Sequence, residues 1–259
     1  MNDLTDKIVL VTGGSGGIGA AIAGQFATLG CRVAIAARDH KKLATTAEKL
    51  AENGAQVRAI ACDVTRREEV QRLRIAIQEL WGDVQILVNN AGIASAVSFA
   101  DMSDATWDRT LDTNLTGAYN CCKVFLPAMI ETNWGRIVNI ASTAAKVGYS
   151  HVTAYTASKH GLLGLTRSLA LETARQGVTV NAICPGYVDD ERTRENARIM
   201  AEKTGKSGDD ILKIFAASAP QNRLIEATEV AALACLIASS QMSGMTGQAI
   251  NVDGGAVMS

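Results

Sequence analysis

The sequence predicts an α/β fold in which a single doubly wound sheet of seven parallel strands is covered by helices on both faces. Short apolar runs alternate with longer helical stretches along all 259 residues. Continuous apolar strands of this kind are typical of parallel sheets that are buried on both faces. A glycine-rich turn follows the first run, and no repeat or low-complexity linker divides the chain. We therefore expect a single domain over residues 1–259.

The composition narrows the class of protein. Lys and Arg total 25 against 26 Asp and Glu, so charge alone gives no reason to expect nucleic acid or a membrane surface as a partner. Neither a signal-peptide pattern nor an apolar run of about 18 residues occurs, which predicts a cytoplasmic protein. The cysteines lack metal-ligand spacing, so we expect buried, reduced thiols and no metal. They are Cys31, Cys62, Cys121, Cys122, Cys184 and Cys235.

The elements alternate as strand and helix. We expect strands at residues 7–12, 32–37, 56–61, 84–88, 137–141, 178–184 and 248–252. We expect helices from the glycine-rich turn to residue 30, and at 41–53, 66–81, 104–129, 155–175 and 226–238. The charged stretch 189–219 breaks this alternation, and its length predicts a helical lid over a site at the carboxyl ends of the strands.

The turn after the first strand indicates a Rossmann-like dinucleotide site. It contains Gly13, Ser15, Gly17, Ile18 and Gly19, and it opens a helix. Glycine permits a positive φ in the turn and a close approach of backbone to phosphate. The helix N-terminus then offers N–H groups to a pyrophosphate.

The end of the second strand points to the phosphorylated cofactor. Dinucleotide folds often carry a carboxylate there for the ribose hydroxyls, but this chain has Ala37 followed by Arg38. A guanidinium suits a 2′-phosphate, so NADP(H) is preferred and NAD(H) remains open. After the third strand, Asp63 either accepts from the adenine amino group or caps the next helix, and Val64 follows it.

Polar and small residues mark the centre of the sheet. Asn90, Ala91 and Gly92 end the fourth strand and leave room for a cofactor. Asn114 lies within an apolar helical stretch, where its amide must be satisfied. It is therefore either a structural link or a residue that holds a water molecule.

The stretch from Ser142 to Lys159 carries the chemistry. Tyr155 and Lys159 are four residues apart and lie on one face of a helix. An ammonium favours the phenolate form of a neighbouring phenol, which can then exchange a proton with an alcohol or a ketone. Ser142 follows a buried strand, thirteen residues before the tyrosine.

Taken together, the motifs resemble those of the short-chain dehydrogenase/reductase family over essentially the whole chain. They are Thr12-Gly13-x-x-x-Gly17-Ile18-Gly19, Asn89-Asn90-Ala91-Gly92, Asn114, Ser142, Tyr155-x-x-x-Lys159, Pro185-Gly186 and Val252-Asp253-Gly254-Gly255. The resemblance implies that Tyr155 is the general acid/base and that Ser142 holds the substrate oxygen. It implies that Lys159 favours the tyrosinate and binds the nicotinamide ribose, and that Asn114 fixes a water molecule of the proton relay. It also implies a homotetramer.

One position departs from the family pattern. Relatives commonly carry Pro-Gly-x-Val-x-Thr, whose Thr contacts the nicotinamide carboxamide, but here Asp190 stands in the Thr position. Cofactor contacts are expected from Pro185, Gly186 and the Val188 backbone, with Thr193 as a substitute.

The substrate is less closely defined. The chain is similar to 3-oxoacyl reductases and 3-hydroxyacyl-CoA dehydrogenases, which implies an acyl-thioester substrate. The basic residues of 189–219 either meet an anionic carrier or belong to an ordinary solvated helix. Expected substrate contacts are Ser95, Ser142, Thr143, Tyr149, Tyr155 and Tyr187. Ala94 and Val147 complete the expected pocket lining, which is mostly apolar.

Three functions follow. The first is an NADP(H)-dependent oxidoreductase that interconverts a ketone and a secondary alcohol, with a 3-oxoacyl thioester as the favoured substrate. The second is a dehydrogenase of a free cyclic, sugar-derived or steroid-like alcohol. The third is a non-catalytic NADP-binding protein, and the presence of all four residues of the relay argues against it.

Overall fold

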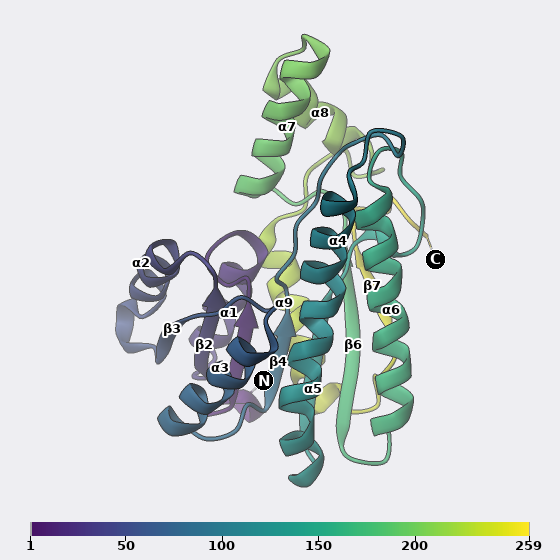
Figure 1. Ribbon diagram of the computed structural model, residues 1–259. Coiled ribbons are helices and arrows are strands. Elements are labelled where there is room, and N and C mark those ends of the chain that lie inside the picture. Colours follow the sequence, from purple (N-terminus) through teal and green to yellow (C-terminus); the bar gives the residue numbers. More distant parts are fainter. Residues whose placement is uncertain (1, 259) are drawn as a thin grey trace.

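The computed structural model describes residues 2–258, apart from the side chains of Asn2 and Asn53, and contains one parallel sheet. Its strands are β1 (Ile8–Thr12), β2 (Arg32–Ala37), β3 (Val57–Ala61), β4 (Ile86–Asn89), β5 (Gly135–Ile140), β6 (Val178–Pro185) and β7 (Ala249–Val252). They lie in the order β3-β2-β1-β4-β5-β6-β7. The predicted Rossmann-like α/β fold is therefore confirmed (Figure 1).

The helices cover both faces of this sheet (Figure 1). They are α1 (Gly17–Thr28), α2 (His40–Leu50), α3 (Arg67–Leu80), α4 (Asp104–Leu111), α5 (Gly117–Glu131), α6 (Thr153–Thr173), α7 (Glu191–Thr204), α8 (Gly208–Ala217) and α9 (Ala227–Ala238). On one face α1, α2 and α9 pack on the sheet, and on the other α3, α5 and α6 do so.

Alternation along the strands explains the two layers. In β1, Val9 and Val11 face the α1–α9 layer and Leu10 faces the α3–α5 layer. Successive side chains of a strand point to opposite faces, so an all-apolar strand feeds two cores at once. Both cores consist of side chains that are almost fully buried. The six cysteines are free and buried, as predicted.

The stretch expected as one helix over 104–129 is divided. A π-helical segment, Asp112–Thr116, separates α4 from α5, and the Gly117 N–H donates to the Asp112 carbonyl across five residues. Apolar periodicity did not reveal this wider turn, because the residues on either side continue the helical pattern. π-segments of this kind are frequent at functional sites, and this one contains Asn114.

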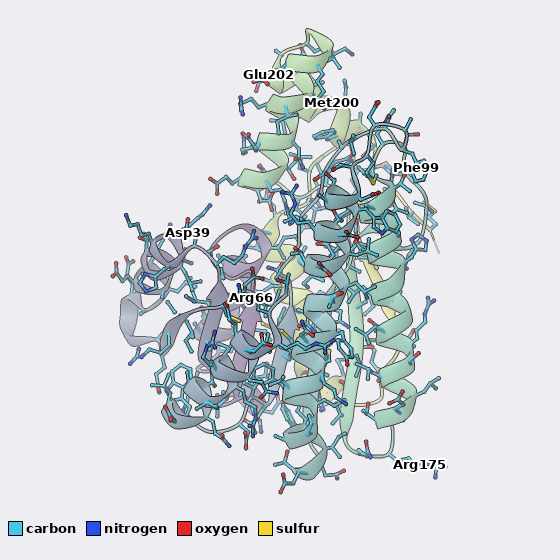
Figure 2. All side chains as sticks on the ribbon, viewed as in Figure 1. Asp39, Arg66, Phe99, Arg175, Met200 and Glu202 are labelled. Carbon is cyan, nitrogen blue, oxygen red and sulfur yellow. The ribbon has the colours of Figure 1, made fainter. Side chains whose placement is uncertain are left out.

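The stretch 189–219 forms two helices, α7 and α8, which pack on each other and project from the end of the molecule where β6 ends (Figure 1). Figure 2 places Met200 and Glu202 towards the far end of this projection and Arg175 at the opposite end of the molecule. The strand order reverses between β1 and β4, which are neighbours, and ligands of such sheets bind at that point beside the carboxyl ends. Within residues 2–258, no helix is both long and apolar enough to cross a membrane.

Candidate active site

A groove of about 370 Å³ opens at the reversal of strand order. Most residues predicted to bind a cofactor line it, namely Gly13, Ser15, Gly17, Ile18, Gly19, Arg38, Asp63, Val64, Asn90, Ala91 and Gly92. The sequence motifs of four separate strand ends therefore meet in one place. Tyr155, Lys159, Pro185, Gly186, Val188 and Thr193 were also predicted to bind the cofactor, but they do not line this groove.

Glycine is required at two positions of the turn that forms the floor of the groove. Gly13 has a φ of +66°, and a Cβ on it would lie 2.8 Å from the Asn90 Nδ2. A Cβ on Gly19 would lie 2.3 Å from the Gly13 carbonyl oxygen. The N-cap of α1 is Gly16, and among the described residues no side-chain cap bonds the start of this helix. The groove thus offers free N–H groups and close backbone approach, and this fits the pyrophosphate of a dinucleotide.

Asn90 holds the two halves of the groove together. Its Nδ2 donates to the carbonyls of Thr12 and Gly13, at 3.0 and 3.1 Å. The Thr12 hydroxyl in turn accepts from the N–H groups of Asn90 and Ala91. These bonds join the ends of β1 and β4, so the groove has a rigid floor before any ligand binds.

The adenosine side of the groove carries charges of both signs. Arg38 and Lys42 line it, and so does Asp63. The Asp63 carboxylate accepts from the backbone N–H and the hydroxyl of Thr65, at 3.0 and 2.8 Å. It therefore closes the turn after β3 rather than capping α3, whose N-cap is Arg66. Sequence reasoning missed Lys42, although its place one turn after Arg38 was a signal for it.

Asn114 links the loop after β4 to α6. Its Oδ1 accepts from the Ile93 N–H at 2.8 Å, and its Nδ2 donates to the Ile93 carbonyl at 2.9 Å. The same Nδ2 lies 3.0 Å from the Ser158 hydroxyl, which donates to the Tyr155 carbonyl. The side chain is 1% exposed. These bonds satisfy the amide as a structural link would, and both the link and the water-holding role stay predictions.

Lys159 is buried beside the groove and beneath Tyr155. Its Nζ donates to the Ile140 carbonyl at 2.7 Å and lies 5.7 Å from the centre of the Tyr155 ring. A Cβ on Gly92 would lie 3.6 Å from the same Nζ. Burial, and secondarily the charge of Arg192, lower the pKa of Lys159 to about 7. The amine can thus change its protonation state near neutral pH.

Ser142 lies two residues past the end of β5. Its hydroxyl oxygen accepts from the Ala144 N–H at 3.1 Å and begins a short 3-10 helix, Thr143–Ala145. An acceptor bond of this kind leaves the hydroxyl hydrogen able to donate to a ligand. Tyr155 is partly exposed, as a residue that meets a substrate must be.

A second cavity, of about 450 Å³, has Thr143, the residue after Ser142, in its lining. Thr143, Val147, Tyr149 and Tyr187 line it, in agreement with the sequence prediction. Ala94, Ser95, Ser142 and Tyr155 do not line it, and their contact with a substrate stays a prediction.

Phe215 of α8 also lines the second cavity, and sequence reasoning missed it. Its ring stacks on Tyr187 with the ring centres 4.3 Å apart and the planes within 3°. This flat apolar wall depends on a contact between α8 and the loop after β6, so local sequence could not show it.

The loop from β6 to α7 corrects one prediction. Asp190 caps α7 by accepting from the Thr193 N–H at 2.8 Å, and both side chains are nearly buried. A Cβ on Gly17 would lie 2.7 Å from the Asp190 Oδ2. Asp190 therefore lines the groove, whereas Thr193 is buried, does not line it and does not take the place of the missing Thr.

The basic residues of α7 are mostly paired within the helix and its cap. Arg194 pairs with Asp189, and Arg198 pairs with both Glu195 and Glu202. These neighbouring acids reduce the positive charge that α7 presents. The arrangement agrees with the alternative of an ordinary solvated helix rather than a carrier-binding surface.

Comparison with known proteins decides the family. The model of the short chain dehydrogenases matches residues 7–201. The chain belongs to the short chain dehydrogenase family. It is an enzyme, an NAD(P)-dependent dehydrogenase or reductase.

Individual relatives in this family are similar over nearly their whole length. A 3-oxoacyl-(acyl-carrier-protein) reductase FabG of Staphylococcus epidermidis is 34% identical over 254 residues, which are 98% of this chain and all of that protein. A D-beta-hydroxybutyrate dehydrogenase of Cupriavidus necator is 34% identical over 97% of this chain and 98% of its own length. The crystal structure of a variant actinorhodin polyketide ketoreductase with NADPH superposes with a TM-score of 0.94 at 38% identity, covering 99% of this chain and 98% of the other.

Proposed function

We propose that this enzyme uses NADP(H) to interconvert a ketone and a secondary alcohol, with a 3-oxoacyl thioester as the favoured substrate. One observation carries the proposal. The partly exposed Tyr155 lies above a buried Lys159 that is fixed to β5 and adjoins Gly92 of the dinucleotide groove. The residue that exchanges the proton, Tyr155, and the residue beside the cofactor groove, Lys159, therefore lie one turn apart on α6.

Each residue has a defined task in ketone reduction. NADPH, when bound, supplies the hydride that the carbonyl carbon receives. Tyr155 donates a proton to the carbonyl oxygen, and Ser142 donates a hydrogen bond to the same oxygen. Lys159 stabilises the tyrosinate that results, and Asn114 keeps the loop after β4 in register with α6. Alcohol oxidation uses the same groups in the opposite direction.

The cofactor preference rests on Arg38 and Lys42, two cations that line the adenosine side of the groove. The solved ketoreductase with NADPH has a closely similar fold, which supports the same preference here. The acyl-thioester substrate is supported by the 3-oxoacyl-(acyl-carrier-protein) reductase among the relatives. The shape of the second cavity also fits an acyl chain or a ring, because the Tyr187–Phe215 pair forms one wall.

A paired assay tests the proposal. Oxidation of NADPH and of NADH is followed with an acetoacetyl thioester and, separately, with a panel of cyclic and aliphatic ketones. We expect rapid thioester reduction with NADPH. Activity on free ketones alone would favour the second function, a dehydrogenase of a free alcohol. NADPH binding without any ketone-dependent oxidation would sink the proposal and favour the non-catalytic function.

Three further features belong to the proposal. We propose that α7 and α8 act as the lid over the site, since Asp190 and Glu191 line the groove and Phe215 lines the second cavity. A homotetramer and a cytoplasmic location remain predictions. Light scattering of the purified protein measures the first, and fractionation of the source cells the second.

A further inference from the structure

Three consecutive charged residues at the start of α7 reach across the dinucleotide groove. The Asp190 carboxylate faces Gly17, and the Arg192 guanidinium lies 3.3 Å from the Gly92 carbonyl oxygen. Between them, Glu191 forms an ion pair with Lys42 of α2. This pair joins residues 149 positions apart in the sequence. It ties the start of α7 to the opposite wall of the groove.

Lys42 is held at a defined place in that wall. Asp39 caps α2 by accepting from the Lys42 N–H at 3.0 Å, and the Thr46 hydroxyl donates to the Ser15 carbonyl at 3.0 Å. The N-terminal half of α2 is thus fastened to the glycine-rich turn. A Cβ on Gly16 would lie 3.7 Å from the Lys42 Nζ.

The groove wall at this point suits a phosphate. Arg38 directly follows the end of β2 and lines the groove together with Lys42. Within the part of the chain that the structure describes, Arg38 forms no ion pair. In this topology the ribose of the adenosine lies at the end of the second strand. A phosphate on that ribose would therefore meet Arg38 and Lys42 at the same time.

We propose that Glu191 reduces the enzyme's preference for NADPH over NADH by competing with the ribose 2′-phosphate for Lys42. The inference rests on the proposed use of NADP(H). If the phosphate displaces Glu191, some ion-pair energy is lost on binding. If both anions share the ammonium, their like charges repel. In either arrangement the carboxylate weakens the binding of a phosphorylated dinucleotide and leaves NADH unaffected.

The size of the effect follows from exposure. The Lys42 and Glu191 side chains are 46% and 77% exposed, so the pair is screened by water. Exposed ion pairs change equilibria by about two- to fivefold. Glu191→Gln should therefore tighten NADPH about two- to fivefold, with NADH changed by less than about twofold. Lys42→Ala should weaken NADPH about fivefold or more, because the hydrogen bond from its ammonium to the phosphate would be charge-assisted.

The test measures dissociation constants of NADPH and NADH by nucleotide fluorescence, without ketone, for the full-length enzyme. The matched control is Glu195→Gln, which removes the same charge one turn further along α7, where Glu195 pairs with Arg198 at 2.7 Å. We expect the control to leave the NADPH to NADH ratio unchanged. We expect the double variant, Lys42→Ala with Glu191→Gln, to bind NADPH no more tightly than Lys42→Ala alone.

Three results would overturn the inference: an unchanged ratio in Glu191→Gln, an equal gain for both nucleotides, or the full gain persisting without Lys42. Failure of the proposed function is a separate result. It would appear as a lack of ketone turnover, while the binding ratio would remain measurable.

Discussion

Two groups of polar residues beside the groove are held in opposite ways. The first is Asn114 with Lys159, and the second is Glu191 with Arg192. Asn114 and Lys159 are buried, and both bond to backbone carbonyls of the sheet and its loops. Glu191 and Arg192 are exposed; Glu191 pairs with Lys42 and Arg192 contacts the Gly92 carbonyl across the groove. Buried polar groups are expensive to leave unpaired, whereas exposed ion pairs contribute little.

This difference separates the work of the site. The buried group is fixed in a single arrangement, which suits proton transfer, because that chemistry depends on geometry. The exposed group can exchange partners at little cost in free energy, which suits cofactor entry and release. We expect substitutions in the buried group to reduce turnover strongly and substitutions at the start of α7 to adjust binding.

The largest effect should come from the group that the buried residues support. Tyr155→Phe removes the hydroxyl that exchanges the proton and keeps the ring above Lys159. We expect kcat/KM for ketone reduction to fall by about 100-fold to 10,000-fold, the usual contribution of a general acid. The NADPH dissociation constant should stay within about twofold of wild type. Turnover near the wild-type rate would refute the assigned role.

Asn114→Ala tests whether this buried amide contributes to turnover in addition to stability. The change leaves the Ile93 N–H and carbonyl without their partner, so unfolding should become easier by about 1–3 kcal/mol. Misplacement of the loop after β4 should also lower kcat/KM by about 100-fold.

The control for Asn114 is Asn120→Ala, since Asn120 is a second buried amide and bonds the Val64 carbonyl at 2.9 Å. We expect a comparable loss of stability there, measured by urea unfolding, with kcat reduced less than about threefold. Equal losses of kcat in both variants would mean that Asn114 contributes through stability alone.

Lys159 makes a testable contribution to stability. Its pKa is about 7 in the folded enzyme, against an ordinary value of 10.5. Between these values the unfolded chain binds a proton that the folded chain has released, so the free energy of unfolding rises with pH. The rise from this group is at most about 1.4 kcal/mol per pH unit.

Urea unfolding of wild type and Lys159→Met between about pH 7 and about pH 8 isolates this slope, because the cysteines contribute equally to both proteins. Burial raises the pKa of Cys31, Cys62, Cys122 and Cys235 to about 12 in the folded enzyme, whereas the thiols of the unfolded chain lose protons from about pH 8. Above about pH 8 the cysteines therefore lower the free energy of unfolding in wild type and variant alike. Lys159→Met should abolish the rise. The same slope in wild type and variant would show that Lys159 titrates normally.

The smallest effect is expected at Arg192, the exposed residue whose charge acts on the buried Lys159. Arg192 is a secondary cause of the lowered pKa of Lys159, after burial. Arg192→Gln removes a like charge, so the pKa of Lys159 should rise by less than about one unit. The alkaline limb of the pH profile of kcat/KM, where Lys159 loses its proton, should move to higher pH by the same amount. A shift to lower pH, or a shift that also occurs in Arg198→Gln on the outer part of α7, would contradict this coupling.

Much of the fold and the central residues could be predicted from the sequence, because their signals are local. Apolar runs show buried strands, and the glycines of the first turn mark close backbone approach. Tyr155 and Lys159 lie one turn apart on a helix in any fold that contains it. The prediction of a continuous helix around Asn114 was wrong, because the π-segment there keeps the apolar pattern of an uninterrupted helix.

The sequence by itself therefore determined the order of strands and helices, the turn that receives a dinucleotide and the proton-exchanging pair. Only the tertiary structure decided which distant side chains meet. Three contacts join segments that are distant along the chain and meet at the strand ends. They are the Glu191–Lys42 pair, the Phe215–Tyr187 stack and the approach of Asp190 to Gly17. Their contacts depend on how α7 and α8 pack over the sheet, and no local pattern of residues encodes that arrangement.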